Sequence, residues 1–461
     1  MEFASYWKYR FRPFSVTFLL LCSPVKEKAS HSLGLSMART DQAVADYSDR
    51  NPATCVSSRK TFFGRSRCGI AIAEIVFVVS TELKWENVQK VFMTLQVLVL
   101  PGEGIGPEVI KEAVKVLRWF ISYREIDVAI RCEPYGVESY KSHGVLISDT
   151  VFQSLLSVDA VLFGATGGPE FDSLPTTVRQ SRNLLAIRKH MGVYANLRPV
   201  RAYDELADVT SLKESAVENT DIVVVRELNG GIYFGEPRGR DVDEGGIERA
   251  SNTLTYTVPE IERIARVAFN LARTRNGHVH SVDKSNVLET YKLWREVVTR
   301  IGKTEFPDIP LEHIIVDNCA MQIIRNPRQF DVILADNMIG DILSDLAGAI
   351  TGTLGMLPSV SLSDTNEDGH RCALFEPVHG SAPDIAGQGV ANPLAAIMCV
   401  GLLFEYSLKL PQEAVFLSDA VSEVLASGCR TEDIKIKNRN AVSTEKMGDE
   451  ILKVLFSLNK T

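Results

Sequence analysis

The sequence is poor in cysteine, and no two of its cysteines have the spacing of a metal-binding or redox motif. Eight cysteines are spread over 461 residues, which is too sparse for a disulfide scaffold and fits a reducing compartment. No apolar run is long enough to cross a bilayer. An internal repeat and a low-complexity tract are also lacking. These absences favour a cytoplasmic globular protein without a membrane partner.

Positive charge is in deficit overall, since the net charge is −8. This balance argues against a general nucleic-acid binder. The deficit is uneven, because residues 1–92 hold 13 Lys/Arg and 8 Asp/Glu, or +5, which leaves −13 for the remainder. Hydrophobic content of 45% and charged content of 23% describe an ordinary globular protein with an ample core.

Residues 1–92 are an atypical N-terminal extension. Lys8, Arg10 and Arg12 precede a short apolar run, residues 14–22, which is too short for a membrane span. Three interpretations are open: sequence that precedes a true start at Met93, an organellar targeting segment, or an accessory segment. We favour the first, and we expect the extension to be disordered, a targeting segment or a gene-model artefact.

From residue 95 the chain alternates short apolar runs with amphipathic segments, which predicts an α/β fold. The expected strands are 97–100, 160–163, 222–226, 278–282, 314–317 and 332–335. The expected helices are 107–121, 259–275, 286–301, 341–351 and 393–407.

A glycine-rich connection, residues 101–108, follows the first expected strand. Its spacing is G-x-G-x-G-P rather than the G-x-G-x-x-G of a dinucleotide-binding loop. The pattern does not favour a Rossmann fold. We expect these glycines to shape a tight connection between strand and helix.

Carboxylates at helical spacing suggest a metal site. Asp341 and Asp345 are four residues apart in an expected helix, so their side chains share one face. Asp317 could add a third oxygen from another element. Three carboxylates without Cys or His favour Mg2+ or Mn2+ over zinc. A solvated helix face remains the alternative for the aspartate pair alone.

Cationic residues elsewhere suit an anionic substrate. Arg188, Arg198 and Arg226 carry guanidinium groups that bind carboxylates in bidentate fashion, and Arg226 closes an apolar strand where an unpaired charge is costly. Lys284 follows another strand and could act as a base or proton relay. Tyr233 lies between glycines, where its hydroxyl could reach substrate. For each of these residues the alternative is a purely structural role, in an ion pair or in packing.

Seven motifs together resemble one enzyme family, the β-decarboxylating dehydrogenases of isocitrate, isopropylmalate and tartrate. They extend over nearly all of residues 93–461: PGEGIGPEV (101–109), ANLRP (195–199), VRELNGGIYFGEPRG (225–239), SVDKSNVLE (281–289), VDNCAM (316–321), GDILSDLAG (340–348) and FEPVHGSAPDIAGQGVANP (375–393). The resemblance is nearest to the isopropylmalate branch, particularly its fungal members. It implies NAD-dependent oxidative decarboxylation of (2R,3S)-3-isopropylmalate to 4-methyl-2-oxopentanoate and CO2, a step of leucine biosynthesis.

The resemblance also implies roles for single residues. Substrate would be bound by Arg188, Arg198, Arg226, Asp317, Leu184 and Val287; Mg2+ or Mn2+ by Asp317, Asp341 and Asp345; and NAD by Gly380, Ser381, Ala382, Pro383, Asp384, Ile385, Asn392 and Asn286. Tyr233 would protonate the product carbon, and Lys284, through water or Asp341, would accept the hydroxyl proton. In this family Lys284 and Asp317 come from the partner subunit, which implies a homodimer with composite sites.

The expected cofactor choice rests on Asp384. Its carboxylate can accept hydrogen bonds from the ribose hydroxyls and would repel a 2′-phosphate, whereas NADP-preferring relatives carry a Lys-Tyr pair at the positions of Asp384 and Ile385. The resemblance therefore implies NAD.

One segment departs from the family pattern. Where relatives read R-P-E-x-G-L-L, this chain has Ser181 for the glutamate and Asn183 for the glycine. The apolar residues Leu184 and Val287 are retained. A paralogue acting on another 3-substituted malate is therefore the alternative to the leucine-pathway enzyme. A catalytically silent regulatory subunit is a further alternative, of another class.

The fold implied by the resemblance is a two-domain α/β architecture around a mixed sheet, without Rossmann topology. The larger domain would combine residues 93–195 and 350–461. The second domain, residues 196–349, would form most of the dimer contact.

Overall fold

The chain divides into two compact units, Met1–Met93 and Thr94–Thr461. The computed structural model describes residues 94–366, 371–436 and 439–460, together with four strands nearer the N-terminus. These strands form an antiparallel sheet in the order β1-β2-β4-β3: β1 (Ser5–Arg10), β2 (Ser15–Leu21), β3 (Val56–Ser66) and β4 (Gly69–Val79). The rest of the extension lies outside the described residues, and its disordered, targeting or artefactual nature stays a prediction.

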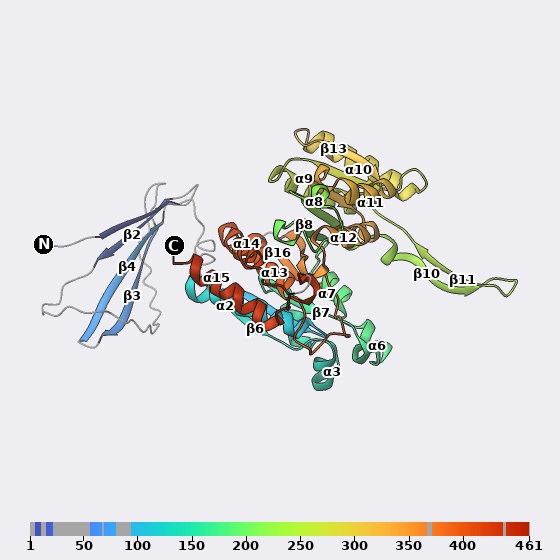
Figure 1. Ribbon diagram of the computed structural model, residues 1–461. Helices are drawn as coiled ribbons and strands as arrows, with labels where there is room; N and C mark the ends of the chain where they lie inside the picture. The colour runs from blue at the N-terminus through green and yellow to red at the C-terminus, as the bar shows by residue number, and fades with distance from the viewer. Residues whose placement is uncertain are drawn as a thin grey trace. The chain divides into compact units, whose positions relative to one another are not determined.

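A single ten-stranded mixed sheet organises the second unit (Figure 1). Its strand order is β13-β12-β14-β9-β8-β15-β16-β7-β5-β6. The strands are β5 (Leu95–Gly102), β6 (Val128–Cys132), β7 (Ala160–Ala165), β8 (Ala195–Arg201), β9 (Asp221–Glu227), β12 (Val279–Asp283), β13 (Leu311–Ile315), β14 (Val332–Ala335), β15 (Pro358–Thr365) and β16 (Arg371–Pro377).

Two blocks of four parallel strands flank the sheet's centre. β13, β12, β14 and β9 are parallel to one another, and so are β16, β7, β5 and β6. Between the blocks, β8 and β15 run antiparallel to their neighbours. Every residue of β7 is buried, as expected for a parallel strand covered on both faces. The predicted mixed sheet is confirmed, and this strand order is not that of a Rossmann fold.

Helices pack on most strands of the sheet. α2 packs on β5 and β7, α13 on β15 and β16, α9 on β14, α10 on β12, and α12 on β8 and β9. The long helices are α2 (Gly106–Tyr123), α9 (Val258–Arg273), α10 (Glu289–Glu305), α11 (Val316–Arg325), α12 (Asn337–Thr351), α13 (Leu394–Tyr406), α14 (Pro411–Ala426) and α15 (Thr444–Leu458). The short ones are α3 (Val137–His143), α4 (Asp149–Ser154), α5 (Pro169–Asp172), α6 (Thr176–Gln180), α7 (Leu184–His190) and α8 (Glu214–Val217).

Several of the predicted boundaries were wrong, and three of these differences lie near candidate site residues. The strand expected at 314–317 ends at Ile315, so Asp317 lies in the first turn of α11. The helix expected from 286 begins at Glu289. The helix expected from 341 begins four residues earlier, at Asn337, because the side chain of Asp336 accepts a hydrogen bond from the Ile339 amide and caps the helix.

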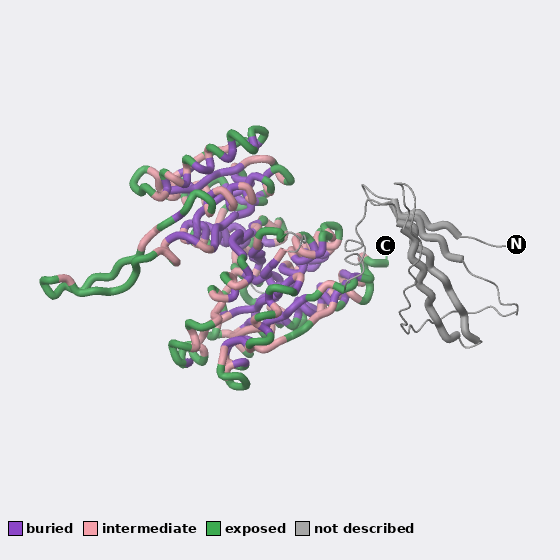
Figure 2. The backbone as a smooth tube through the Cα atoms, turned by 180° about the vertical axis from the view of Figure 1, so that it is seen from behind, coloured by how far each residue is buried: buried purple, intermediate pink, exposed green. Residues whose placement is uncertain are grey.

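A two-stranded hairpin projects from the unit and is exposed along nearly all of its length (Figure 2). β10 (Gly235–Val242) pairs with β11 (Glu248–Thr253), and no third strand joins them. An isolated hairpin is at best marginally stable in water. We therefore expect the hairpin to pack against another protein surface.

Apolar packing is extensive throughout the described part of the second unit, and the largest fully buried side chains include Trp294, Tyr135 and Phe163. No helix among the described residues is long and apolar enough to cross a membrane. The predicted boundaries within 93–461, near 195 and 350, stay predictions.

Candidate active site

The first turn of α12 supports the candidate site. The side chain of Asp336 is fully buried and accepts hydrogen bonds from the Ile339 amide at 2.7 Å and the Tyr291 hydroxyl at 2.8 Å. Burial raises the pKa of Asp336. The next residue, Asn337, donates its side-chain amide to the carbonyls of Leu228 and Gly230 at 3.0 and 3.3 Å. The start of α12 is thereby tied to the loop that follows β9.

Arg226, the second-last residue of β9, faces this helix. Its Nε and Nη2 donate to the Asn337 side-chain oxygen at 3.1 and 2.8 Å, and its Nη1 pairs with Asp341. Only 6% of the Arg226 side chain is exposed. Burial lowers its pKa to about 10, which still leaves the guanidinium charged at neutral pH. A Cβ on Gly340 would lie 2.8 Å from Arg226 Cγ, so only glycine leaves room for the arginine.

Arg198, on the neighbouring strand β8, meets the same helix. Its Nη1 donates to Asp345 at 3.1 Å and to the Ser344 hydroxyl at 2.8 Å, and its Nη2 lies 3.4 Å from Asp341. Asp341 and Asp345 are one helical turn apart, with side chains 36% and 55% exposed. Two acids and two arginines therefore form one network, in which the acids keep oxygen atoms open to solvent.

Arg188 adds a third guanidinium. It lies in α7 and forms an ion pair with buried Glu376 of β16. Its positive charge lowers the pKa of both Arg198 and Arg226, after the larger effect of burial. The three arginines predicted from the sequence thus lie within electrostatic range of one another, which is costly unless anions are present.

Tyr233 lies at the edge of this network. It ends the short 3-10 turn Gly231–Tyr233, and 37% of it is exposed. Partial burial, followed by the charge of Asp341, raises the pKa of the tyrosine hydroxyl. The hydroxyl therefore holds its proton at neutral pH and can donate it.

Lys284 and Asp317 lie apart from the arginines in the single chain. Lys284 follows β12, Asp317 begins α11, and the two side chains form an ion pair with each other. The three predicted metal ligands, Asp317, Asp341 and Asp345, are not gathered as a group within one chain. One chain thus presents two separate parts of the predicted constellation.

The predicted substrate-pocket residues are also divided. Leu184 is half-buried against a cluster around Leu98 and Phe163, whereas Val287 is 64% exposed. Asn183, the departure from the family's glycine, caps α7 by accepting a hydrogen bond from the Ala186 amide at 3.0 Å. The substitution therefore has a local structural role in positioning the helix that carries Arg188.

The predicted cofactor loop packs against the glycine-rich connection. The Ile105 amide donates to the Ser381 carbonyl at 2.8 Å. A Cβ on Gly104, whose φ is +61°, would lie 1.9 Å from the same carbonyl. Close backbone approach therefore explains Gly104. This agrees with the tight connection between strand and helix that the sequence predicts.

The remaining cofactor candidates differ in exposure. Gly380, Pro383, Asp384 and Asn286 are exposed, Ala382 and Ile385 are half-buried, and Ser381 and Asn392 are buried. Asn392 makes bonds within the chain, since its amide donates to Asp433 at 3.1 Å and its carbonyl oxygen accepts from the Leu394 amide.

Sequence reasoning missed two supporting residues. Glu376 pairs with Arg188, and Asn337 holds Arg226. Asn337 stands directly after the expected strand 332–335 and Asp336, where polar residues gather at strand ends, and this position was the available signal. Glu376 lies inside the motif at 375–393, but nothing in its spacing points to an arginine 188 residues away.

Comparison with known proteins identifies the family. The family model described as isocitrate/isopropylmalate dehydrogenase matches residues 96–451. A 3-isopropylmalate dehydrogenase from Paramagnetospirillum magneticum is 49% identical over 364 residues, which cover 79% of this chain and 99% of that protein. One from Pelagibacter ubique is 48% identical over 78% of this chain and 98% of that protein. These relatives are bacterial, and closeness to fungal members stays a prediction.

Solved structures agree on the fold. Isocitrate dehydrogenase from Methylococcus capsulatus is 33% identical, with a TM-score of 0.65 over 78% of this chain and 99% of that one. A β-decarboxylating dehydrogenase from Thermococcus kodakarensis is 35% identical, with a TM-score of 0.64 over 80% of this chain and 98% of that one. The predicted fold class is confirmed.

Proposed function

Because the chain belongs to the isocitrate/isopropylmalate dehydrogenase family, we propose that it oxidatively decarboxylates (2R,3S)-3-isopropylmalate with NAD, in leucine biosynthesis. The observation that carries the proposal is the junction at Asp341. There one carboxylate meets Arg198, Arg226 and Tyr233 and stands one turn from Asp345. Positions for anions, a cation and a proton donor meet at this point. The choice of 3-isopropylmalate as substrate follows from the names of the relatives.

The arginines would bind the substrate's carboxylates. Arg188, Arg198 and Arg226 bring three positive charges together, and substrate carboxylates would relieve their mutual repulsion. Ion pairs with Asp341, Asp345 and Glu376 orient the guanidinium groups in advance. Preorganised charge of this kind lowers the cost of binding.

A divalent cation fits the donor set. Asp341 and Asp345 offer solvent-accessible carboxylate oxygens, the ligand type of Mg2+ and Mn2+. Asp317 of a second copy would complete the set. When bound, such an ion polarises the hydroxyl and the developing oxo group of the substrate.

Two side chains would move the protons. Lys284 of the second copy, through water or Asp341, would accept the proton of the C2 hydroxyl as the C2 hydride leaves for NAD. The bond from C3 to its carboxylate then breaks, its electron pair stays with the substrate, and CO2 departs. Tyr233 would donate a proton to C3, since its hydroxyl is protonated at neutral pH.

NAD fits the exposed loop that contains Asp384. The carboxylate is exposed, so ribose hydroxyls could donate to it and a 2′-phosphate would be repelled. Steady-state rates with NAD and NADP test this preference. Higher catalytic efficiency with NADP would contradict it.

A homodimer with composite sites would join the two separated parts. The exposed hairpin β10–β11 and the exposed apolar residues Met321 of α11 and Ile342 of α12 offer surface for a second copy. Such an interface would bring Lys284 and Asp317 of one chain to the arginines of the other. Sedimentation of the purified chain tests the dimer.

Two alternative functions are not favoured. A specialised paralogue would act on another 3-substituted malate, and a silent subunit would lack turnover. Initial rates of NADH formation with Mg2+ on 3-isopropylmalate, 3-benzylmalate and tartrate separate the three. We expect 3-isopropylmalate to be the best substrate. Negligible activity on it beside activity on 3-benzylmalate would favour the paralogue, and no activity on any would favour the silent subunit.

A further inference from the structure

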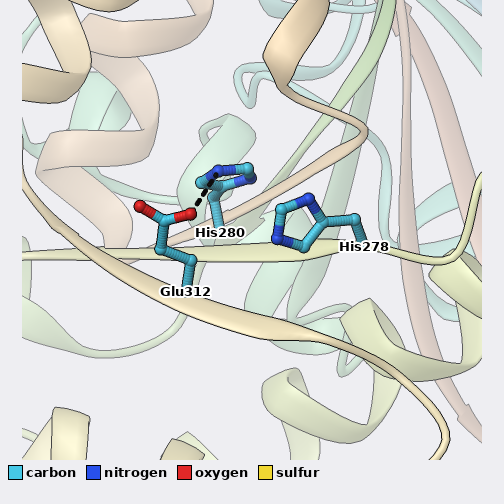
Figure 3. Close-up of side chains that lie close together, drawn as sticks. All are labelled: His278, His280 and Glu312. Carbon is cyan, nitrogen blue, oxygen red and sulfur yellow. Dashed lines mark ion pairs between the residues drawn. The ribbon is translucent and has the colours of Figure 1, made fainter.

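A second group of metal-ligating side chains lies at the outer edge of the sheet (Figure 3). His280 of β12 stands directly opposite Glu312 of β13, the edge strand. His278 precedes His280 by two residues and therefore faces the same side of the sheet. The ligand atoms of the three side chains all lie within 4.8 Å of one another, and no other such group of three occurs among the described residues.

The spacing of this group matches a coordination shell better than a hydrogen bond. His280 Nε2 and Glu312 Oε2 are 3.6 Å apart, beyond hydrogen-bond range. Metal–ligand distances of about 2.0–2.2 Å put two ligands of a tetrahedral zinc site roughly 3.3–3.5 Å apart. The centroids of the His278 and His280 imidazole rings are 4.2 Å apart, and the ring planes are tilted by 50° to each other. Figure 3 shows the ring of His280 between the Glu312 carboxylate and the ring of His278.

The surroundings leave the group without another explanation. His280 is 2% exposed and packs edge-on against Phe330, and its Nδ1 has no hydrogen-bond partner. The Glu312 side chain is 64% exposed, and one of its oxygens lies 3.6 Å from Nε2 of this ring.

The site is separate from the residues assigned to catalysis. Asp283, also on β12, pairs with Arg295 of α10, and Ser281 accepts from Trp294 of the same helix. Since side chains alternate along a strand, α10 covers the opposite face from His278 and His280. Lys284 pairs with Asp317, whereas His280 lies next to Glu312, so the two groups share no ion pair.

We propose that His278, His280 and Glu312 bind one borderline divalent ion, Zn2+ in preference to Mg2+, with water in the remaining coordination position. Two imidazoles and one carboxylate suit zinc, whereas Mg2+ selects oxygen ligands. The bound ion links β12 to the edge strand β13. It thereby stabilises β13, which lies at the edge of the sheet and has β12 as its single neighbouring strand.

The test is a Zn2+ titration of the full chain in saturating Mg2+, which occupies the oxygen-ligand site. His278→Ala and Glu312→Gln change partly exposed side chains, and His143→Ala removes an exposed histidine as a control. We expect wild type and His143→Ala to bind one more Zn2+ per chain than either site variant. Zn2+ should also raise the urea midpoint of wild type and leave that of the site variants unchanged.

The outcome that would overturn the proposal is equal zinc stoichiometry in wild type and both site variants, or no zinc binding by wild type. Cobalt substitution gives a further readout, because nitrogen and oxygen ligands produce visible bands without the thiolate charge-transfer band that a cysteine site would add. A cobalt spectrum that carries that band and persists in Glu312→Gln would assign the ion to cysteine and refute the site.

Discussion

Two groups of predicted site residues differ in how the chain holds them. Arg198 and Arg226 are buried, bonded to α12, and fixed by partners such as Asn337. Lys284 and Asp317 are bonded to each other, and Asp317 is 68% exposed. The first group is held by contacts within the chain, whereas the second is more exposed and makes fewer such contacts. The homodimer proposed above would join the second group to the first.

The largest expected effect tests whether Lys284, of the pair Lys284 and Asp317, is catalytic. Lys284→Met should lower kcat by a factor of about 10²–10⁴, the usual contribution of a positioned acid or base. Substrate binding, measured by calorimetry in the presence of Mg2+, should remain. Lys292→Met is the matched control, because that lysine pairs with Glu289 on the exposed surface of α10. Near-normal turnover of Lys284→Met would remove the lysine from the mechanism.

The next prediction compares how much each group contributes to the free energy of unfolding. The anchored group is Arg198 and Arg226 with their partners, and the exposed group is Lys284 and Asp317. Asn337→Ala removes the acceptor of two Arg226 hydrogen bonds and should lower the free energy of unfolding by about 3 kcal/mol. Asp317→Ala removes an exposed ion pair and should cost less than about 1 kcal/mol. Urea unfolding measures both. Equal losses would contradict the division into an anchored and an exposed group.

A steric prediction concerns the anchored group alone. Gly340→Ala places a methyl group against Arg226 and should cost about 1–3 kcal/mol of stability. Gly401→Ala is the control, since it also lies within a helix and its Cβ would meet no atom closer than 3.9 Å. Thermal denaturation compares the two. A neutral Gly340→Ala would show that Arg226 is not tightly held.

The smallest effect concerns the start of α7. Asn183→Ala removes the cap of the helix that carries Arg188 and should cost about 1 kcal/mol. Asn183→Gly should cost only a few tenths of that amount, because glycine is tolerated at this position of a helix. Urea midpoints of the two variants decide the point. If alanine costs no more than glycine, the cap contributes nothing.

The anchored group was the easier one to predict from the sequence. Asp341 and Asp345 follow from a four-residue spacing, and Arg226 from its place at the end of an apolar strand. Asp317 was misplaced at a strand end, because the apolar run of β13 continues into the first turn of α11. The partners Asn337 and Glu376 depend on contacts between distant segments. Local patterns carry no signal for such pairs, and no pattern revealed the histidines opposite Glu312.

The most direct test of a site shared between two copies is complementation. Tyr233→Phe disables the group around Asp341, and Lys284→Met disables the other, so either homodimer should be nearly inactive. Coexpression should yield mixed dimers in which one of two sites is intact, restoring about one quarter of wild-type activity for random pairing. Activity no greater than the sum of the two variants would contradict a composite site and place the whole reaction within one chain.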